Sequence, residues 1–177
     1  MTGKIAAVAI RVLAIFPEMD TSAVERFRSK WDPLAAAVPA HITVAFPFEW
    51  SGPLPSLATA IQPVLAACAP FALDLPALTI WEDEYLFLLV DEGREQVCWL
   101  HESIYGLALD GVQRPSHFVP HMTVGRCAEK AALQAGIRET AAMNLPLVGR
   151  ALSLTVYRRD EDGRRVRELH MPLGPAS

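Results

Sequence analysis

The chain has 177 residues, enough for one domain of ordinary size or for two small lobes that share an interface. Its hydrophobic content of 51% and charged content of 20% are typical of a globular protein with a sizeable core and exclude extensive disorder. The net charge of −4 argues against binding along extended duplex nucleic acid, because proteins that neutralise many phosphates are usually basic. No apolar run has the length of a membrane span or the form of a secretion signal, so we expect a cytoplasmic protein that does not bind membranes.

The first half of the chain has a pattern of alternating strands and helices. Ser22 and Glu25 have the spacing of a capping box at the start of a helix. Pro76 lies within the last apolar run of this half and indicates an edge strand or a bulge. The predicted elements are a strand over residues 5–16, a helix over 22–31, a strand over 40–46, a helix over 57–68 and a strand over 72–81.

The second half repeats this order. Val97, Leu100, Ile104 and Leu107 fall on one face of a predicted helix. A polar turn over residues 159–163 joins the last two strands. The predicted elements are a strand over residues 85–90, a helix over 94–109, a strand over 118–125, a helix over 128–141, and strands over 148–157 and 166–171.

The spacings indicate a duplicated chain. Ala72, in the predicted strand that follows His41, lies 31 residues after it. Leu152, in the corresponding strand of the second half, lies 31 residues after His121. The period of 80 residues between the two histidines is too long for a solenoid repeat and favours two lobes. We therefore predict a single domain over residues 1–177 that consists of two pseudo-repeated lobes, approximately residues 1–82 and 83–177.

Both histidines open the same short motif, HITV from His41 and HMTV from His121. In a strand, residues two apart point to the same face and lie roughly 6–7 Å apart. His41 and Thr43 therefore share one face, as do His121 and Thr123, while the apolar residues between them anchor the opposite face in a core. A single copy would more often hold a structural histidine, but two copies at matching points of a repeat favour a site.

This pair of motifs suits phosphate esters. Cleavage of a 2′,3′-cyclic phosphate needs a base to deprotonate water and an acid to protonate the departing ribose oxygen, and two histidines with pKa values near 6.5 can divide these roles. Hydroxyls of Thr43 and Thr123 can donate hydrogen bonds to the phosphoryl oxygens, where negative charge accumulates. The chemistry requires no metal and no cofactor, and with the histidine roles exchanged it runs toward ester formation.

The two motifs resemble the signature of the two-histidine (2H) phosphoesterase superfamily, which includes 2′-5′ RNA ligases and cyclic nucleotide phosphodiesterases. The flanking residues match as well, in HITVAFPF over 41–48 and FVPHMTVGR over 118–126. The resemblance implies that His41 and His121 are the acid and base, in an order that it does not settle. It also implies that Thr43 and Thr123 bind phosphate. The fold that we expect is α/β of the α+β type, bilobal, with two largely antiparallel sheets flanking a central cleft and helices outside.

Other residues have weaker signals. Arg126 follows the second motif and can hold a phosphate, although exposure at the end of a strand fits equally well. Phe16, Phe46, Phe48 and Tyr85 could stack a base beside the cleft, but core packing is the better interpretation for most of them. Five arginines cluster around the last hairpin, where three acidic residues dilute their field and favour a solvated turn: Arg158, Arg159, Arg164, Arg165 and Arg167.

Metal binding is disfavoured by the sequence. His117 and His121 have the spacing of a helical metal motif, but Pro120 and the apolar alternation around them indicate a strand. His101 and His170 have no partner motif and are expected to be structural or exposed.

The function predicted first is a 2′,3′-cyclic phosphodiesterase or 2′-5′ RNA ligase-like enzyme that acts on RNA termini or small cyclic nucleotides. A non-catalytic module that binds RNA ends or nucleotides is the second possibility, and an esterase for a non-nucleotide phosphate is the third. We expect a monomer.

Overall fold

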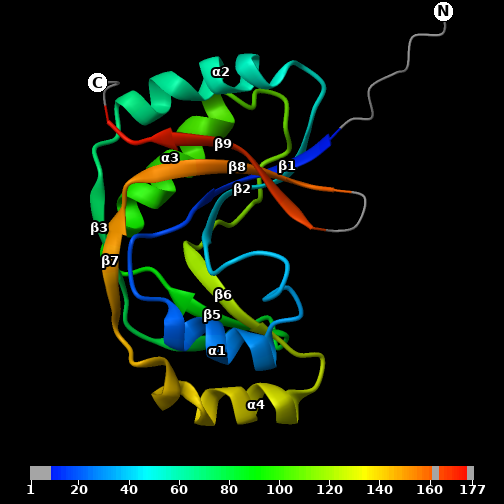
Figure 1. Ribbon diagram of the computed structural model, residues 1–177, viewed down its shortest axis with the longest axis vertical. Helices are drawn as coiled ribbons and strands as arrows, with labels where there is room; N and C mark the ends of the chain where they lie inside the picture. The colour runs from blue at the N-terminus through cyan, green and yellow to red at the C-terminus, as the bar shows by residue number, and fades with distance from the viewer. Residues whose placement is uncertain (1–8, 161–163, 175–177) are drawn as a thin grey trace, which may run out of the picture.

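The computed structural model describes residues 9–160 and 164–174 of the chain (Figure 1). In chain order the elements are β1 (Ala9–Ile15), α1 (Ser22–Trp31), β2 (Ile42–Trp50), α2 (Leu54–Ala66), β3 (Phe71–Leu75), β4 (Leu78–Trp81), β5 (Tyr85–Leu89), α3 (Arg94–Leu107), β6 (His121–Arg126), α4 (Lys130–Arg138), the 3-10 helix η1 (Thr140–Met143), β7 (Leu147–Ala151), β8 (Ser153–Arg159) and β9 (Arg165–Pro172). Seven strands form one sheet in the order β4-β5-β6-β2-β1-β8-β9, and β3 pairs with β7 in a second. All these neighbours are antiparallel, which confirms the predicted α+β class with two antiparallel sheets.

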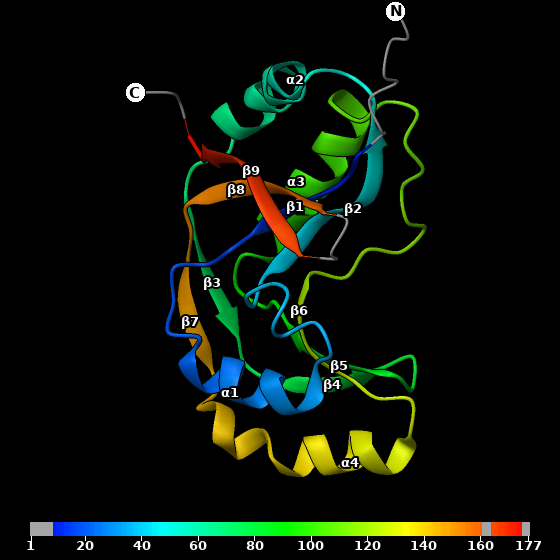
Figure 2. The same cartoon turned by 45° about the vertical axis from the view of Figure 1, so that its right-hand side comes forward.

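The large sheet consists of two parts that meet at one point. Within the described residues, β2 pairs with β6 only through Ile42 and Met122, whereas β1 and β2 share six residue pairs. Both Ile42 and Met122 are completely buried. Figure 2 shows β1, β2, β8 and β9 in the upper part of the molecule, with β4, β5 and β6 below them. The contact between the two parts of the sheet thus falls within the two histidine motifs.

The helices cross between the two parts. Helix α1 follows β1 in the chain but packs against β6, and α3 follows β5 but packs against β2. Helix α2 covers α3 and β9, whereas α4 packs against β4 and β5. Segments from both halves of the sequence therefore contribute to each part, and the prediction of a duplicated chain divided near residue 82 stays a prediction.

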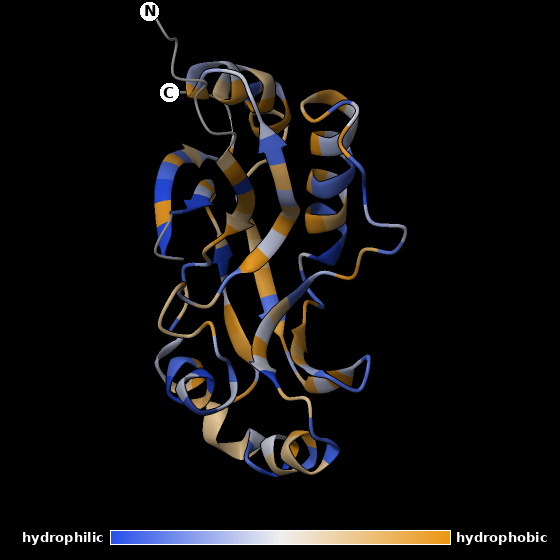
Figure 3. Ribbon diagram, turned by 90° about the vertical axis from the view of Figure 1, so that its right-hand side faces the viewer, coloured by the Kyte–Doolittle hydropathy of each residue, from blue (hydrophilic) through white to orange (hydrophobic). Residues whose placement is uncertain are grey.

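The helices pack by one face each. In Figure 3, α1 and α4 have hydrophilic and hydrophobic residues side by side along the same ribbon. On α1, Val24 and Phe27 are buried in the core that also holds Ile42, Met122 and Leu86. None of the helices in the described part of the chain is both long and apolar enough to cross a membrane.

Two predicted strands are wrong in their extent, because each is two strands that belong to different sheets. The run over 72–81 divides into β3 and β4 around Pro76, and the run over 148–157 divides into β7 and β8 at Leu152. Proline cannot donate to a strand ladder, which explains the first break. The predicted strand over 5–16 is confirmed from Ala9 onward, and its first residues lie outside the described part, as do residues 161–163 of the predicted turn.

The capping box predicted for α1 is also wrong, although the bounds of the helix are as predicted. Thr21 is the N-cap residue and has no side-chain hydrogen bond to the helix. The backbone nitrogen of Ser22 donates instead to Asp20 (2.9 Å). The Glu25 carboxylate turns toward Arg28 and accepts from the backbone nitrogen of Ala40. Glu25 therefore fixes the loop that leads to the first motif and does not cap its own helix.

Candidate functional site

The four motif residues lie on one face of the sheet. The side chains of Ile42 and Met122 point into the core, so the residues on either side of each point the other way. The antiparallel register places His41 beside Thr123 and Thr43 beside His121. All four are half-buried. The structure thus brings both predicted His-x-Thr pairs together at the contact between the two parts of the sheet.

His41 is held at both ring nitrogens. Its Nδ1 donates to the carbonyl oxygen of Pro39 at 2.7 Å, and its Nε2 lies 3.3 Å from the hydroxyl of Tyr157. Phe16 packs against the ring, with a centroid distance of 5.4 Å. Burial is the main influence on His41 and lowers its pKa, against the opposing effect of the hydrogen bond to Pro39.

His121, on β6, repeats the hydrogen bond from Nδ1. Its Nδ1 donates to the carbonyl oxygen of Val119, again two residues earlier, at 2.6 Å. The ring stacks on Phe87, with centroids 3.6 Å apart and an interplanar angle of 16°. Burial lowers the pKa of His121, and the hydrogen bond to Val119 opposes this effect.

The shared hydrogen bond fixes the tautomer of both imidazoles. A carbonyl oxygen can only accept, so Nδ1 carries the proton in each ring. When neutral, His41 and His121 therefore both present the lone pair of Nε2, and when protonated they present an Nε2–H donor. Two such groups on one face can serve as base and acid toward a ligand that lies between them.

Two arginines of the last hairpin lie on the His41 side of the site. The guanidinium of Arg165 lies over the Tyr157 ring at 5.9 Å from its centroid, and that of Arg167 lies over Phe16 at 5.8 Å. The sequence indicated a solvated hairpin here, but two of its arginines lie beside aromatic rings that contact His41. The sequence interpretation could not use their spacing of two, because the predicted strand began at residue 166, after Arg165.

Arg126 lies on the opposite side, at the end of β6. Its Nε donates to Glu84 at 2.7 Å, and its guanidinium lies 5.3 Å from the Tyr85 ring centroid. The side chain is more than half exposed, and hydrogen bonding to Glu84 raises its pKa. The ion pair uses Nε, so the terminal nitrogens can still reach a ligand.

The aromatic candidates have different surroundings. Phe48 is buried in the core, and Phe46 packs against His101 and Phe118 beneath α3. Phe16 and Tyr85 lie on the two sides of the site. The sequence interpretation did not include Phe87 or Tyr157, which contact the two histidines directly.

Two cavities open next to residues that contact the motif histidines, although none of the four motif residues lines either cavity. One of about 630 Å³ is lined by Tyr157 and Arg165 on the His41 side. The other, of about 1010 Å³, is lined by Trp81 and Val119 on the His121 side. Pro47 lines both. Each has the volume of a small-molecule site.

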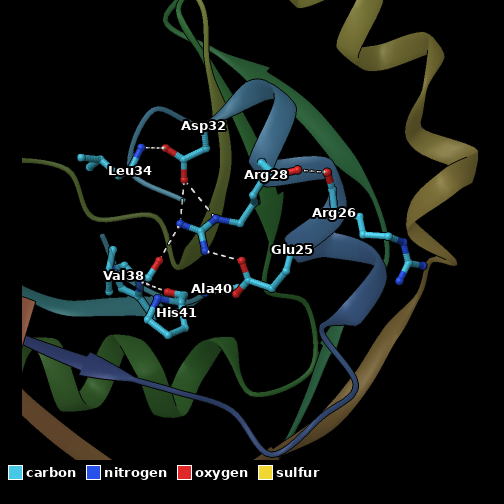
Figure 4. Close-up of polar contacts among 10 residues, drawn as sticks. Glu25, Arg26, Arg28, Asp32, Leu34, Val38, Ala40 and His41 are labelled. Atoms are coloured by element: carbon cyan, nitrogen blue, oxygen red, sulfur yellow. Dashed lines mark hydrogen bonds and ion pairs between the residues drawn. The ribbon is translucent and has the colours of Figure 1, made fainter. Parts of the chain in front are cut away.

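A buried charge cluster supports the loop before His41 (Figure 4). Arg28, only 1% exposed, donates to Asp32 at 2.7 and 3.0 Å, to Glu25 at 2.8 Å and to the carbonyl oxygen of Val38 at 3.0 Å. This cluster ties α1 to residues 32–40. Since Pro39, which accepts from His41, belongs to that segment, the cluster positions the first histidine.

Side chains of α3 cover the edge of β2 where β6 has diverged. His101 Nδ1 donates to the carbonyl oxygen of Val44 at 2.7 Å, and the backbone nitrogen of Phe46 donates to the hydroxyl of Tyr105 at 3.2 Å. His101 is buried and stacks on Phe118 at 3.8 Å, which agrees with the structural role expected for it. These side chains replace a strand partner for β2 and allow the two parts of the sheet to separate beyond the motifs.

Metal-ligating side chains do not gather in groups of three or more in residues 9–160 and 164–174. His117 is exposed in the loop before β6, while His121 is on the strand itself, so the two do not share a helix.

Known proteins are similar to this chain in sequence. The family model of the 2′-5′ RNA ligase superfamily matches residues 16–163. A protein of Bacillus cereus (strain G9842), whose name assigns it provisionally to the phosphoesterases, is 30% identical over 118 residues, which are 64% of this chain and 67% of that protein. A similarly named protein of Bacillus cereus (strain ATCC 10987 / NRS 248) is 29% identical over the same length.

Solved structures share the fold. The crystal structure of Escherichia coli LigT in complex with 3′-AMP aligns with a TM-score of 0.61 and 19% identity, over 94% of this chain and 98% of LigT. A crystal structure described as a phosphoesterase aligns with a TM-score of 0.63 and 18% identity, over 94% and 99% of the two chains. Together with the family match, they show that this chain belongs to the 2′-5′ RNA ligase superfamily of 2H phosphoesterases.

Proposed function

We propose that this protein is an enzyme that opens 2′,3′-cyclic phosphates on RNA termini or small nucleotides, with His41 and His121 as its acid–base pair. The observation that carries this proposal is the repeated hydrogen bond from Nδ1 to a backbone carbonyl, which makes Nε2 the proton-exchanging nitrogen of both rings. Two histidines with only a structural role would not be expected to repeat this hydrogen bond where the two motifs meet.

The reaction needs one proton at each end. One Nε2 accepts a proton from water as the water oxygen bonds to phosphorus, and the other donates its proton to the ribose oxygen as the P–O bond breaks. The histidines end with their protonation states exchanged, and solvent restores them. The mechanism requires neither a metal nor a cofactor. Reversal of the same steps joins a hydroxyl to the phosphate, so hydrolysis and 2′-5′ ligation can use one site.

Threonines and arginines bind the phosphate in this proposal. Thr43 and Thr123 share the face of the histidines, and their hydroxyls can donate to the non-bridging oxygens. Arg126 remains a candidate ligand through its terminal nitrogens. The cavities on both sides of the motifs provide room for a nucleoside, and LigT, which has the same fold, has been crystallised with 3′-AMP.

The test is hydrolysis of 2′,3′-cyclic mononucleotides and of short RNAs with a 2′,3′-cyclic end, in the presence of EDTA. We expect activity with the chelator and a loss of at least a hundredfold in His41→Ala and in His121→Ala. His170→Ala, which removes an exposed histidine on β9 that lines neither cavity, is the matched control and should retain activity. Loss of activity in EDTA, or full activity in both motif variants, would contradict the mechanism.

Binding and turnover of the same substrates distinguish this function from the two alternatives. Tight binding without turnover would instead favour a module that holds RNA ends, and turnover confined to non-nucleotide phosphodiesters would favour a metabolite esterase. Comparison of the RNA and mononucleotide rates identifies the substrate class. Sedimentation of the protein with and without RNA tests the expected monomer.

A further inference from the structure

We propose that Tyr157, braced by Arg165, is a positioning residue that keeps the Nε2 of His41 unprotonated, and thereby makes His41 the base and His121 the acid of the hydrolysis. The role assignment rests on the proposed function. The claim that Tyr157 keeps Nε2 of His41 unprotonated does not rest on that function, since it concerns the protein without substrate.

The hydrogen bonds have one consistent direction. Arg165 forms a side-chain hydrogen bond with the Tyr157 hydroxyl, and a guanidinium can only donate. The oxygen of Tyr157 is therefore an acceptor for Arg165, and its own proton is available for His41 Nε2 at 3.3 Å. Because Nδ1 of His41 donates to Pro39, the neutral ring has its lone pair at Nε2 and accepts there from Tyr157.

The Tyr157 ring has little freedom to turn away. It is 6% exposed, and Val12 pairs with it across β1 and β8. Its ring meets His41 edge-on, with centroids 5.8 Å apart at 82°, and Phe16 at 6.2 Å and 64°. Phe16 in turn packs against His41. The hydroxyl therefore stays directed at His41 by packing as well as by the hydrogen bond.

The charges around His41 also favour its neutral form. Arg165 on β9 and Arg28 on α1 are cations that lower its pKa, and the anion Asp32 raises it. Asp32 and Arg28 bind each other directly at 2.7 Å, so their fields at the imidazole largely cancel, and Arg165 adds a further positive charge. Phe16, directly after β1, brings no charge.

His121 has the opposite surroundings. In the described part of the chain no side chain hydrogen-bonds to its Nε2, and its ring lies flat on Phe87. The face of a phenyl ring carries partial negative charge and attracts a cation, so this stacking favours the imidazolium over the neutral ring. Arg126, a cation at the end of the same strand, is paired with Glu84. The protonated acid is therefore better accommodated at His121 than at His41.

The proposed step balances as follows. The Tyr157 ring stays in place while its O–H bond turns aside, and a water donates to His41 Nε2 instead. The cost is small because a contact of 3.3 Å is a weak hydrogen bond. The water proton passes to His41 as the water oxygen bonds to phosphorus. The bond from phosphorus to the ribose oxygen breaks, and that oxygen takes the Nε2 proton of His121.

The experiment is an NMR pH titration of the histidine ring nitrogens in the full chain, for the unmodified protein, Tyr157→Phe and Arg165→Gln. Loss of a donor to the neutral ring should raise the pKa of His41 by about 0.5 to 1 in Tyr157→Phe, as expected for one neutral hydrogen bond. Arg165→Gln should raise it in the same direction. The pKa of His121 should not move in either variant.

Tyr85→Phe is the matched control, because it removes a hydroxyl from the opposite side of the site. It should leave both histidines unchanged. An unchanged His41 in Tyr157→Phe, or equal shifts of His41 and His121, would overturn the proposal, since equal shifts signal general loosening. If the shifts appear as expected but no cyclic phosphate is hydrolysed, the positioning role stands and the proposed function fails.

With an active substrate, the pH profile adds a second readout. The acid limb of kcat/KM should move to higher pH in Tyr157→Phe, and the rate at high pH should change little. A uniform loss at all pH values would contradict a role through His41.

Discussion

Ile42 and Met122 face each other across β2 and β6, and in the described residues this is the single pair through which the two parts of the large sheet join. Each side chain is completely buried on the side opposite the motif histidines. The position of one His-x-Thr pair relative to the other therefore depends on packing between two apolar side chains. The stability of the fold and the geometry of the site meet at this contact.

Truncation of Met122 should therefore be costly. We expect Met122→Ala to lower the free energy of unfolding by about 2–5 kcal/mol, because it opens a cavity beneath the contact between the strands. Val148→Ala, at a side chain that is 64% exposed, should change it by less than about 0.5 kcal/mol. Urea unfolding of the two variants measures the difference, and similar values for both would contradict a central role for this pair.

The Arg28 cluster gives a second prediction. Removal of Arg28 leaves the Asp32 carboxylate, whose side chain is 5% exposed, without its partner. We expect Arg28→Gln to cost about 3–5 kcal/mol of unfolding free energy, as is typical when one member of a buried ion pair is lost.

Arg26→Gln is the control for that variant, because it makes the same change on the exposed face of the same helix (Figure 4). It should alter the free energy of unfolding by less than about 0.5 kcal/mol. If Arg28→Gln were equally mild, the cluster would not be what holds the loop before His41.

Local patterns were sufficient to predict most elements and the His-x-Thr pairs. Alternation over two or three residues places His41 and Thr43 on one strand face, and this needs no knowledge of the rest of the chain. The bounds of α1 followed equally from local sequence. The role of Glu25 did not follow from local sequence, because its partner Ala40 lies on another segment. The spacing of Glu25 from Ser22 also fits a capping box, and this led to the wrong prediction.

Tyr157 and Arg165 were beyond such reasoning. They reach His41 only because β8 pairs with β1 and β9 with β8, and this order of strands has no local signature. The break at Leu152 was hidden for the same reason, since β7 and β8 read as one continuous run until each is assigned to its own sheet. Long-range pairing decides these features.

Acid should destabilise the protein. Burial lowers the pKa values of His41, His101 and His121 in the folded state. In the unfolded chain these groups take up protons near pH 6.5, but the folded chain takes them up only at lower pH. Below about pH 6.5 the unfolded state thus binds more protons, so the free energy of unfolding falls as the pH is lowered from 7.5 toward 5.

Denaturant unfolding across this pH range measures the slope. His101→Gln removes one of the three groups and should flatten the dependence. Greater stability at pH 5.5 than at pH 7.5 would contradict the assignment of these groups as buried and neutral.

The threonine hydroxyls provide the sharpest test of phosphate binding at the site. Thr43 and Thr123 flank the two histidines on the same face, so each hydroxyl can stabilise the charge that develops on a phosphoryl oxygen. We expect Thr43→Ala and Thr123→Ala each to reduce kcat for cyclic phosphate hydrolysis by about 10²–10³, the usual effect of removing one such donor. Thr43→Ser and Thr123→Ser keep the hydroxyl and should recover most of the rate. Thr59→Ala, on the exposed face of α2, should have no effect on kcat. If serine failed to rescue either position, the threonine methyl group and its packing, and not the hydroxyl, would be what the site requires.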